Sequence, residues 1–531
     1  MNRGPLMGWA GDIVERVRDG FASLRGTPPE LPKAYVLKFL DSYAYFSFSL
    51  IFTLFLSSDF GFSDVEAGTA YGAWGALVTV FGLLTGFVID SWGVAASLRV
   101  GFAVSLAARI MIFLTTSRAV LYANVFVLLP LGNCLGIPVL ATGVRRYTRE
   151  DARGFAFGLF YVIMNVAALL SGPVVDACTI LYRGNGGEGG EGDGNGGAGW
   201  TLSGYRAVLL TGIVANVVGC GITWTMREIK VEATTWVGDA DGEGAAGGDA
   251  DAGAGAGVEG EGVSEFVPRP VGAWESVRET LRTPSFWKFL AVCLLTLNVR
   301  MIFRHLDATL PKYMLREFGP DTAKGTVYAI NPAMIIVLVP LITAGTREVD
   351  PLLMIHHGAY VSAASVFFLV LSTSVWACVA FVVVLSIGEA IWSPRLYDYT
   401  MKMCSEGREG TYMALSSAPL FLAQLPVGAM SGFLLERYCP EEGPRNSKMM
   451  WLIIGLTTAV SPLLLTATWR YIASEPGEEA VSPGQRGRGD ADEGIPVLRG
   501  AKMGSASSSQ YRKLDAGAFD SAFALGSDDD D

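Results

Sequence analysis

The chain is built around long apolar runs separated by short polar loops. A membrane helix needs about 20 apolar residues, because the hydrocarbon core is about 30 Å thick and each residue rises about 1.5 Å. Twelve runs reach that length, in two sets of six: 35–57, 67–90, 95–116, 119–144, 154–181 and 202–225, then 285–310, 324–345, 352–373, 374–397, 408–436 and 447–470. The sequence therefore predicts an all-α polytopic membrane protein with about twelve transmembrane helices in two six-helix halves.

Polar segments divide the chain into five expected regions. Residues 1–33 form a cytoplasmic N-terminal segment, 34–227 and 284–471 hold the two helical halves, 228–283 form an acidic Gly/Ala-rich linker, and 472–531 form a tail. The middle of the linker, Asp239 to Glu265, contains no Lys or Arg. Such a stretch cannot bury a core. Linker and tail are therefore expected to be disordered.

Composition excludes several classes of function. Only 17% of the residues are charged, and the net charge of -11 comes from the polar segments, with no basic stripe that would suit nucleic acid. The phosphate loop of ATP-driven pumps and the His-Glu-x-x-His motif are absent. The seven cysteines form no Cys-x-x-Cys pair. We expect no enzymatic activity, cofactor or metal, and a monomer.

Basic residues mark one side of the membrane. The loop 57–66 has no Lys or Arg, whereas the loops after the fourth and tenth runs hold Arg145, Arg146, Arg149, Arg153, Lys402 and Arg408. Because short cytoplasmic loops are rich in Lys and Arg, both termini and the linker are predicted to be cytoplasmic, in the plasma membrane or an organelle membrane such as the vacuole. The loop with Arg437, Arg445 and Lys448 departs from the rule.

The turn between the second and third runs carries a motif. Gly86, Asp90 and Gly93 are spaced as Gly-x-x-x-Asp-x-x-Gly, followed by Arg99. At this loop of a twelve-span chain the pattern resembles the major facilitator superfamily, although the family's second Gly/Arg turn is missing. The resemblance implies a conformational gate in which Asp90 pairs with a cation after the fourth run: Arg145, Arg146 or Arg149.

Further motifs are similar to the proton-dependent oligopeptide transporter family. Phe160-Tyr161-x-x-x-Asn165 resembles its fifth span, Tyr328-x-x-Asn331-Pro332 its eighth, and Gly388-Glu389-x-x-x-Ser393-Pro394 its tenth, and Asp307 matches an acid of its seventh. The resemblance implies a secondary transporter that couples proton uptake to symport of a small polar or zwitterionic solute by alternating access. It also implies hydrogen-bonding groups that face the solute, at Tyr43, Tyr45, Tyr161, Asn165 and Asn331.

The first and fourth spans depart from that family. Its Glu-x-x-Glu-Arg reads here as Lys38-x-x-Asp41-Ser42, and its Lys-Pro as Ile137-Pro138. Two of the usual cations are therefore missing. Two others, Arg300 and Arg304, stand four residues apart in the seventh run and so share a helix face. We expect Lys38, Arg300 and Arg304 to contact the solute.

Charged residues inside a membrane are costly and are functional candidates by default. The expected proton-coupling acids are Glu389, Asp307 and Asp41, since a buried carboxylate without a partner binds a proton readily. Glu389 could instead pair structurally with Lys38 or Arg300. Asp307 could be a solvated charge at the interface, and Lys38 and Asp41 could be a local ion pair.

Two other functions fit the same sequence. One is an antiporter or facilitator from another branch of the superfamily, which Gly172-Pro173 in the fifth run permits. The other is a nutrient sensor that binds a solute and signals through its tails without transport. The partners expected in every case are a small molecule and the lipid bilayer, with protons for the symporter.

Overall fold

The computed structural model describes residues 17–182, 202–229, 282–346, 349–403 and 422–472. All of the described residues belong to one compact unit, within Met1–Pro476. Most of the predicted linker and nearly all of the predicted tail lie outside the described residues.

The N-terminal half forms six segments within the described residues. Their helices are α2 (Glu30–Phe60), α3 (Asp64–Trp92), α4 (Val94–Leu114), α5 (Arg118–Ala123), the π-helical turn η1 (Asn124–Leu128), α6 (Leu129–Cys134), α7 (Ile137–Tyr147), α8 (Glu150–Leu181) and α9 (Gly204–Thr225). The pieces from α5 to α7 make up the fourth segment, Arg118–Tyr147. Its helix is interrupted at Leu135 and Gly136.

The C-terminal half continues the pattern. Its described helices are α11 (Pro284–Leu295), α12 (Leu297–Ala308), α13 (Leu310–Phe318), α14 (Lys324–Gly345), α15 (Pro351–Ser365), α16 (Phe367–Leu371), α17 (Val375–Met403), α19 (Gln424–Tyr438), α20 (Ser447–Ala467) and α21 (Trp469–Ile472). The helices α11, α12 and α13 follow one another closely. The candidate membrane span among them, Phe286–Ala308, lies within the predicted run 285–310, and α13 follows it.

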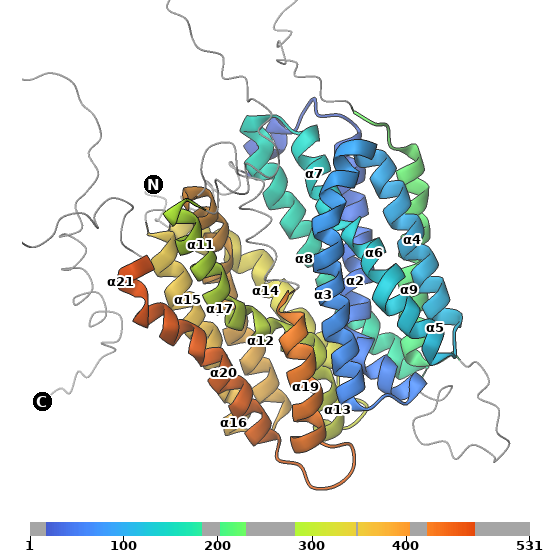
Figure 1. Ribbon diagram of the computed structural model, residues 1–531, viewed down its shortest axis with the longest axis vertical. Coiled ribbons are helices and arrows are strands. Elements are labelled where there is room, and N and C mark those ends of the chain that lie inside the picture. Colours follow the sequence, from blue (N-terminus) through green and yellow to red (C-terminus); the bar gives the residue numbers. More distant parts are fainter. Residues whose placement is uncertain (1–16, 183–201, 230–281, 347–348, 404–421, 473–531) are drawn as a thin grey trace, which may run out of the picture. The chain divides into compact units, whose positions relative to one another are not determined.

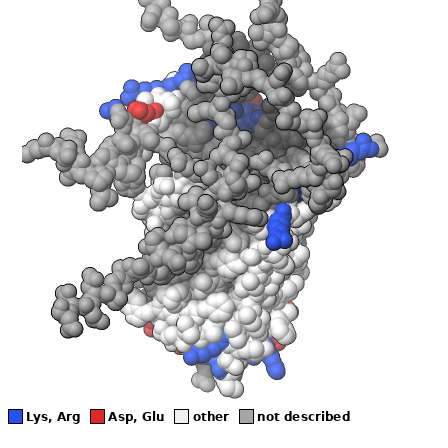
Figure 2. All heavy atoms as spheres, turned by 90° about the vertical axis from the view of Figure 1, so that its left-hand side faces the viewer, with Lys and Arg blue, Asp and Glu red and all other residues white. Residues whose placement is uncertain are grey.

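The predicted all-helical polytopic fold is confirmed. Ten helical segments among the described residues are long and apolar enough to cross a membrane. The other two predicted spans correspond to α3 and, in part, to α19, whose preceding residues 404–421 lie outside the described chain. Figure 2 shows a face whose described surface is mostly uncharged between charged side chains at its lower margin and others near its top. This distribution suits a lipid-facing belt.

Local sequence explains where several helices begin and end. Gly61 ends α2 in the left-handed conformation (φ 63°), and its N–H donates to Ser57 O. The Asp350 carboxylate accepts from Leu352 N and caps α15. Pro351 occupies the first position of that helix, where no N–H is needed.

The two halves meet mainly through two helix pairs, α3 with α19 and α8 with α14 (Figure 1), and α2 also contacts α12 and α13. Glycines make the second contact possible, because a Cβ on Gly172 of α8 would overlap the carbonyl oxygen of Gly325 of α14, and the reverse is also true. One apolar cluster draws side chains from both halves, with Phe52 and Trp74 on one side and Leu306, Tyr313 and Trp451 on the other. The halves are thus in close contact where α2 ends and α3 begins.

Candidate functional site

Asp307 in α12 joins the two halves through its carboxylate. The Oδ2 atom accepts hydrogen bonds from Ser49 of α2 (3.0 Å) and Tyr71 of α3 (3.1 Å). It also pairs with Arg304, one turn earlier in α12, at 3.4 Å. Asp307 is 3% exposed, so it lies within the protein and not at a solvated surface. An acid held in this way ties the seventh span to the first two.

A second layer of polar groups surrounds this ion pair. Tyr45 of α2 accepts from Arg304 Nη1 (3.4 Å), and Gln424 of α19 donates to Tyr45 (3.1 Å) and to Tyr71 (3.3 Å). All four side chains are buried. Protonation of Asp307 would therefore change hydrogen bonds and electrostatic interactions in helices of both halves.

Glu389 in α17 lies in a separate cluster within the C-terminal half. Its Oε2 accepts from Asn331 Nδ2 of α14 at 2.8 Å, and the same amide donates to Ser386 at 3.1 Å. Arg300 of α12 interacts electrostatically with Glu389, and its guanidinium lies 5.3 Å from the ring centroid of Trp392. Three predicted site residues, from the seventh, eighth and tenth spans, are brought together here.

Lys38 and Asp41 in α2 are both buried inside the N-terminal half. The Lys38 ammonium has no hydrogen-bond acceptor within the described residues and lies 4.6 Å from the ring centroid of Phe160. Asp41 interacts electrostatically with Lys38 and also with Arg109 of α4. Lys38, Asp41 and Arg109 thus form a charge cluster of three residues, and Arg109 comes from the third span.

The remaining predicted solute contacts lie elsewhere. Tyr43 donates to Thr211 of α9 at 2.9 Å, so it joins two helices of one half. Asn165 donates to the Tyr161 carbonyl of its own helix at 3.0 Å. Tyr43 thus lies apart from the Asp307 and Glu389 clusters.

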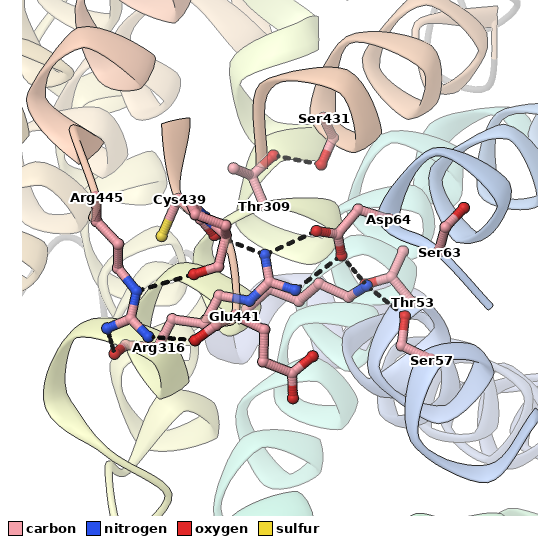
Figure 3. A network of polar contacts seen from close by, with 12 residues as sticks. Thr53, Ser57, Ser63, Asp64, Thr309, Arg316, Ser431, Cys439, Glu441 and Arg445 are labelled. Atoms are coloured by element: carbon pink, nitrogen blue, oxygen red, sulfur yellow. Dashed lines mark hydrogen bonds and ion pairs between the residues drawn. The ribbon is translucent and has the colours of Figure 1, made fainter. Parts of the chain in front are cut away.

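An ion cluster connects the halves beside the loop 61–63 (Figure 3). Asp64, the first residue of α3, accepts from Lys312 (2.7 Å) and from two nitrogens of Arg316 (2.8 and 2.9 Å), both in α13. Lys312 also donates to Ser57 of α2 at 2.6 Å. Asp64 lies outside the candidate membrane spans. Burial raises the pKa of its carboxyl, but Arg316 and Lys312 outweigh this and hold the pKa below its ordinary value.

A second link lies between α8 and α14. The Asp176 carboxylate of α8 accepts from Gly325 N (2.8 Å), Thr326 N (2.7 Å) and Thr326 Oγ1 (2.7 Å) at the start of α14. A carboxylate at a helix N-terminus satisfies unpaired N–H groups and complements the helix dipole. Asp176 therefore holds α14 against α8 at the same place where Gly172 and Gly325 touch.

The predicted gate motif lies where α3 meets α4. Gly93 has a φ of 82°, and the next two backbone N–H groups, of Val94 and Ala95, donate to the Glu228 carboxylate at 2.8 and 2.7 Å. Arg99 donates to Met226 O at 2.6 Å. This turn is thus bound to the end of α9. Gly86 and Asp90 fall within α3, but the surroundings of these two residues are not among those that the structure describes. Their predicted partners Arg145 and Arg149 are exposed.

Comparison with known families identifies the chain. The model of the Major Facilitator Superfamily matches residues 34–423, which is most of the sequence. The chain belongs to the Major Facilitator Superfamily. No curated protein matches it.

Solved structures share the superfamily fold. A POT family transporter in complex with 5-aminolevulinic acid has a TM-score of 0.64 at 13% identity, with 85% of this chain and 98% of that chain covered. The POT family transporter PepTSo has a TM-score of 0.61 at 13% identity and similar coverage, 84% and 98%. The nucleoside transporter NupG has a TM-score of 0.60 at 12% identity, covering 83% and 99%. At these identities the likeness concerns the fold.

Some polar residues of this superfamily member are missing from the sequence-based site. Arg109 and Asp176 lie inside predicted runs, 95–116 and 154–181, so the rule that singled out Arg300 applies equally to them. Gln424 and Tyr71 are uncharged, and nothing local distinguishes them from ordinary polar residues of a span. Asp64, Lys312 and Arg316 belong to segments that resemble loops, and only the fold brings them together.

Proposed function

We propose that the chain is a proton-coupled secondary transporter that carries a small polar or zwitterionic solute by alternating access. The observation that supports this most is a pair of acids inside the bundle, the buried Asp307 and the partly buried Glu389, each beside an arginine of α12. An acid in a membrane interior is a strong candidate for a proton carrier. Because Arg304 and Arg300 favour the ionised form of these acids, a solute that bound to either arginine would change the protonation of the acid beside it.

Asp307 is suited to couple a proton to movement of the halves. While ionised it accepts from Ser49 and Tyr71 of the N-terminal half. A proton on Asp307 would weaken these charge-assisted bonds. The halves would then separate more easily at this point. Coupling requires that the proton and the solute favour the same conformation.

The Asp64–Lys312–Arg316 cluster would act as the latch of this cycle. The Lys/Arg bias predicts that both termini, and the linker 228–283, are cytoplasmic, so the latch would face the opposite side of the membrane. The conformation described here would accordingly be closed on the non-cytoplasmic side, with the halves 34–227 and 284–471 rocking about the site between them. In this proposal one chain is sufficient for the cycle.

The solute would carry an anionic group and an amine. Glu389 could hold the amine, and Arg300 or Arg304 could hold a carboxylate, Arg in bidentate fashion. The solved POT structures with bound 5-aminolevulinic acid and with a conjugated peptide suggest solutes of this kind as the first to try. Because the cations stand in the seventh span, the accepted sizes should differ from those of ordinary di- and tripeptides.

Binding and flux, measured together, test the proposal. Amino acids, 5-aminolevulinic acid, dipeptides and organic acids would be screened by thermal shift on the purified full chain, and each ligand found would then be tested for uptake into liposomes. A transporter moves at least one ligand across the bilayer. A ligand that stabilises the protein but shows no flux would favour the sensor, and flux that ignores a proton gradient would favour a facilitator.

A further inference from the structure

The interior of the N-terminal half contains two buried cations and one acid. Lys38 of α2 is 0% exposed and Arg109 of α4 is 2% exposed. Both lie over aromatic faces: the Lys38 ammonium is 4.6 Å from the centroid of Phe160, and the Arg109 guanidinium carbon is 5.7 Å from that of Phe48. The third charge is Asp41, which interacts electrostatically with both cations. The cluster carries a net charge of about +1 if all three groups are ionised.

Helix register places the members of this cluster near one another. A Cβ on Gly212 of α9 would lie 3.6 Å from Arg109 Nη1 and 3.8 Å from the Ala44 Cβ, so these three positions are level. Asp41 lies about one turn before Ala44 in α2, and Asn216 lies about one turn after Gly212 in α9. Because α2 and α9 run in opposite directions through the bundle, Asp41 and Asn216 come to the same level.

The fourth span approaches the same level. A Cβ on Gly136, at the break between α6 and α7, would lie 2.9 Å from Asp41 Oδ2. Gly132 of α6 packs directly against Ser105, which is one turn before Arg109 in α4. Asn133 therefore stands next to the turn of α4 that precedes Arg109.

Several side chains of this region lack a hydrogen-bond acceptor. Within the described residues, the buried atoms without a partner include Lys38 Nζ, Arg109 Nε, Asn133 Nδ2, Asn216 Nδ2 and the Ser42 hydroxyl. Four of the five are donors with no acceptor function. A buried donor without an acceptor is destabilising, and a buried excess positive charge is more so. These atoms lack acceptors, and Asp41 supplies only one negative charge for the two cations.

We propose that the N-terminal half binds a small monovalent anion between α4, α6 and α9, held by Arg109 and the amides of Asn133 and Asn216. Asp41 neutralises Lys38, and the anion neutralises Arg109. The ligand is a halide or a small carboxylate, since both offer one charge and strong acceptors in a compact volume. This site lies within one half, apart from the Asp307 and Glu389 clusters, and it does not depend on proton coupling.

Thermal unfolding of the purified full chain tests the site. Chloride or acetate replaces methanesulfonate, a larger anion, at constant ionic strength and pH. At least one of the two should raise Tm in a saturable manner. A response to chloride alone identifies a halide site, whereas a response to acetate identifies a carboxylate site. The absence of any anion-specific rise in the wild type would overturn the proposal.

Three variants and one control locate the effect. Arg109→Gln and Asn216→Leu should each remove the anion-dependent rise, and Lys33→Gln, a partly exposed cation of α2 outside the cluster, should retain it. Asp41→Asn should lower the apparent Kd for the anion by about tenfold or more, because one like charge is removed from a buried site. If Arg109→Gln does not fold, the results for Asn216→Leu and Asp41→Asn still decide whether the anion binds at this site. A rise retained in Asn216→Leu, or weaker anion binding in Asp41→Asn, would contradict this assignment.

Discussion

At the scale of the residue, Glu389 and Asp307 differ in what their charges hold. Glu389 accepts from Asn331 within the C-terminal half, whereas Asp307 accepts from Ser49 and Tyr71 of the other half. Glu389 can therefore gain or lose a proton without breaking a direct bond between the halves. We expect it to be the main site of proton coupling, with Asp307 transmitting the change.

Substitution of Glu389 tests this difference. Glu389→Gln should abolish uptake driven by a proton gradient and leave measurable solute exchange, because a permanently neutral group imitates one protonation state. Asp307→Asn should show a milder form of the same defect. Glu436→Gln, an exposed acid of α19, serves as the control and should behave like the wild type. Normal concentrative uptake by Glu389→Gln would show that the proton is carried elsewhere.

Arginine substitution tests the solute pocket. Arg304→Ala should weaken binding of an anionic or zwitterionic solute more than Lys38→Ala does, because Arg304 lies between the halves and Lys38 lies inside one half. The loss should be about tenfold or more in Kd, as expected for a charge-assisted hydrogen bond. Solute affinity would be compared by thermal shift titration. Unchanged affinity after removal of both Arg300 and Arg304 would place the pocket elsewhere.

At the scale of the element, the contact of α8 with α14 depends on two glycines. Gly172→Val should prevent the close approach, because the new side chain would overlap the carbonyl of Gly325. We expect this variant to lose transport. A cysteine introduced at Thr179, near the end of α8, should also react faster with a thiol reagent in this variant. Gly158→Val, on the same helix, is the matched control. A Cβ added at Gly158 would meet no atom of a neighbouring element within 4 Å. Equal transport by both variants would mean that this contact is not needed for closure.

Helix faces mark the limit of what the sequence predicts about elements. The spans follow from apolar length, and each predicted run overlaps a helix. Tyr43 and Tyr45 are two positions apart, which on a helix separates them by more than half a turn, so one reaches Thr211 and the other Arg304. Because apolar and polar residues of α2 are spread around the helix without one distinct face, its sequence does not indicate which way each tyrosine points. The sequence does not predict the helix interruption at Gly136 either, because a glycine within a span also serves ordinary helix packing.

At the scale of the whole molecule, the motifs predict the superfamily and leave the contacts between halves undetermined. Gly86, Asp90 and Gly93 mark the turn between two spans, and that local pattern is readable in sequence. The bonds from Asp64 to Arg316, or from Asp176 to Thr326, join residues 150 positions apart or more. No local pattern encodes such pairs, because they arise only once the helices of both halves are packed.

Membrane orientation is a second property of the whole molecule. A cysteine introduced at Gly247, in the predicted linker, should be protected from an impermeant thiol reagent in intact cells and react after permeabilisation, because the Lys/Arg bias of the short loops predicts that this segment is cytoplasmic. A cysteine introduced at Gly190, in the segment 183–201 that the same bias predicts to lie on the opposite side, should react in intact cells and is the positive control. Labelling of the linker position from outside would reverse the orientation.

Accumulation of solute driven by a proton gradient is the sharpest test of proton-coupled transport. The full chain would be reconstituted in liposomes and supplied with a solute found by the binding screen, with and without an inward proton gradient and with a protonophore. We expect the gradient to raise the internal solute concentration above the external one and the protonophore to abolish this excess. Uptake that stops at equal concentrations under every condition would contradict proton-coupled transport.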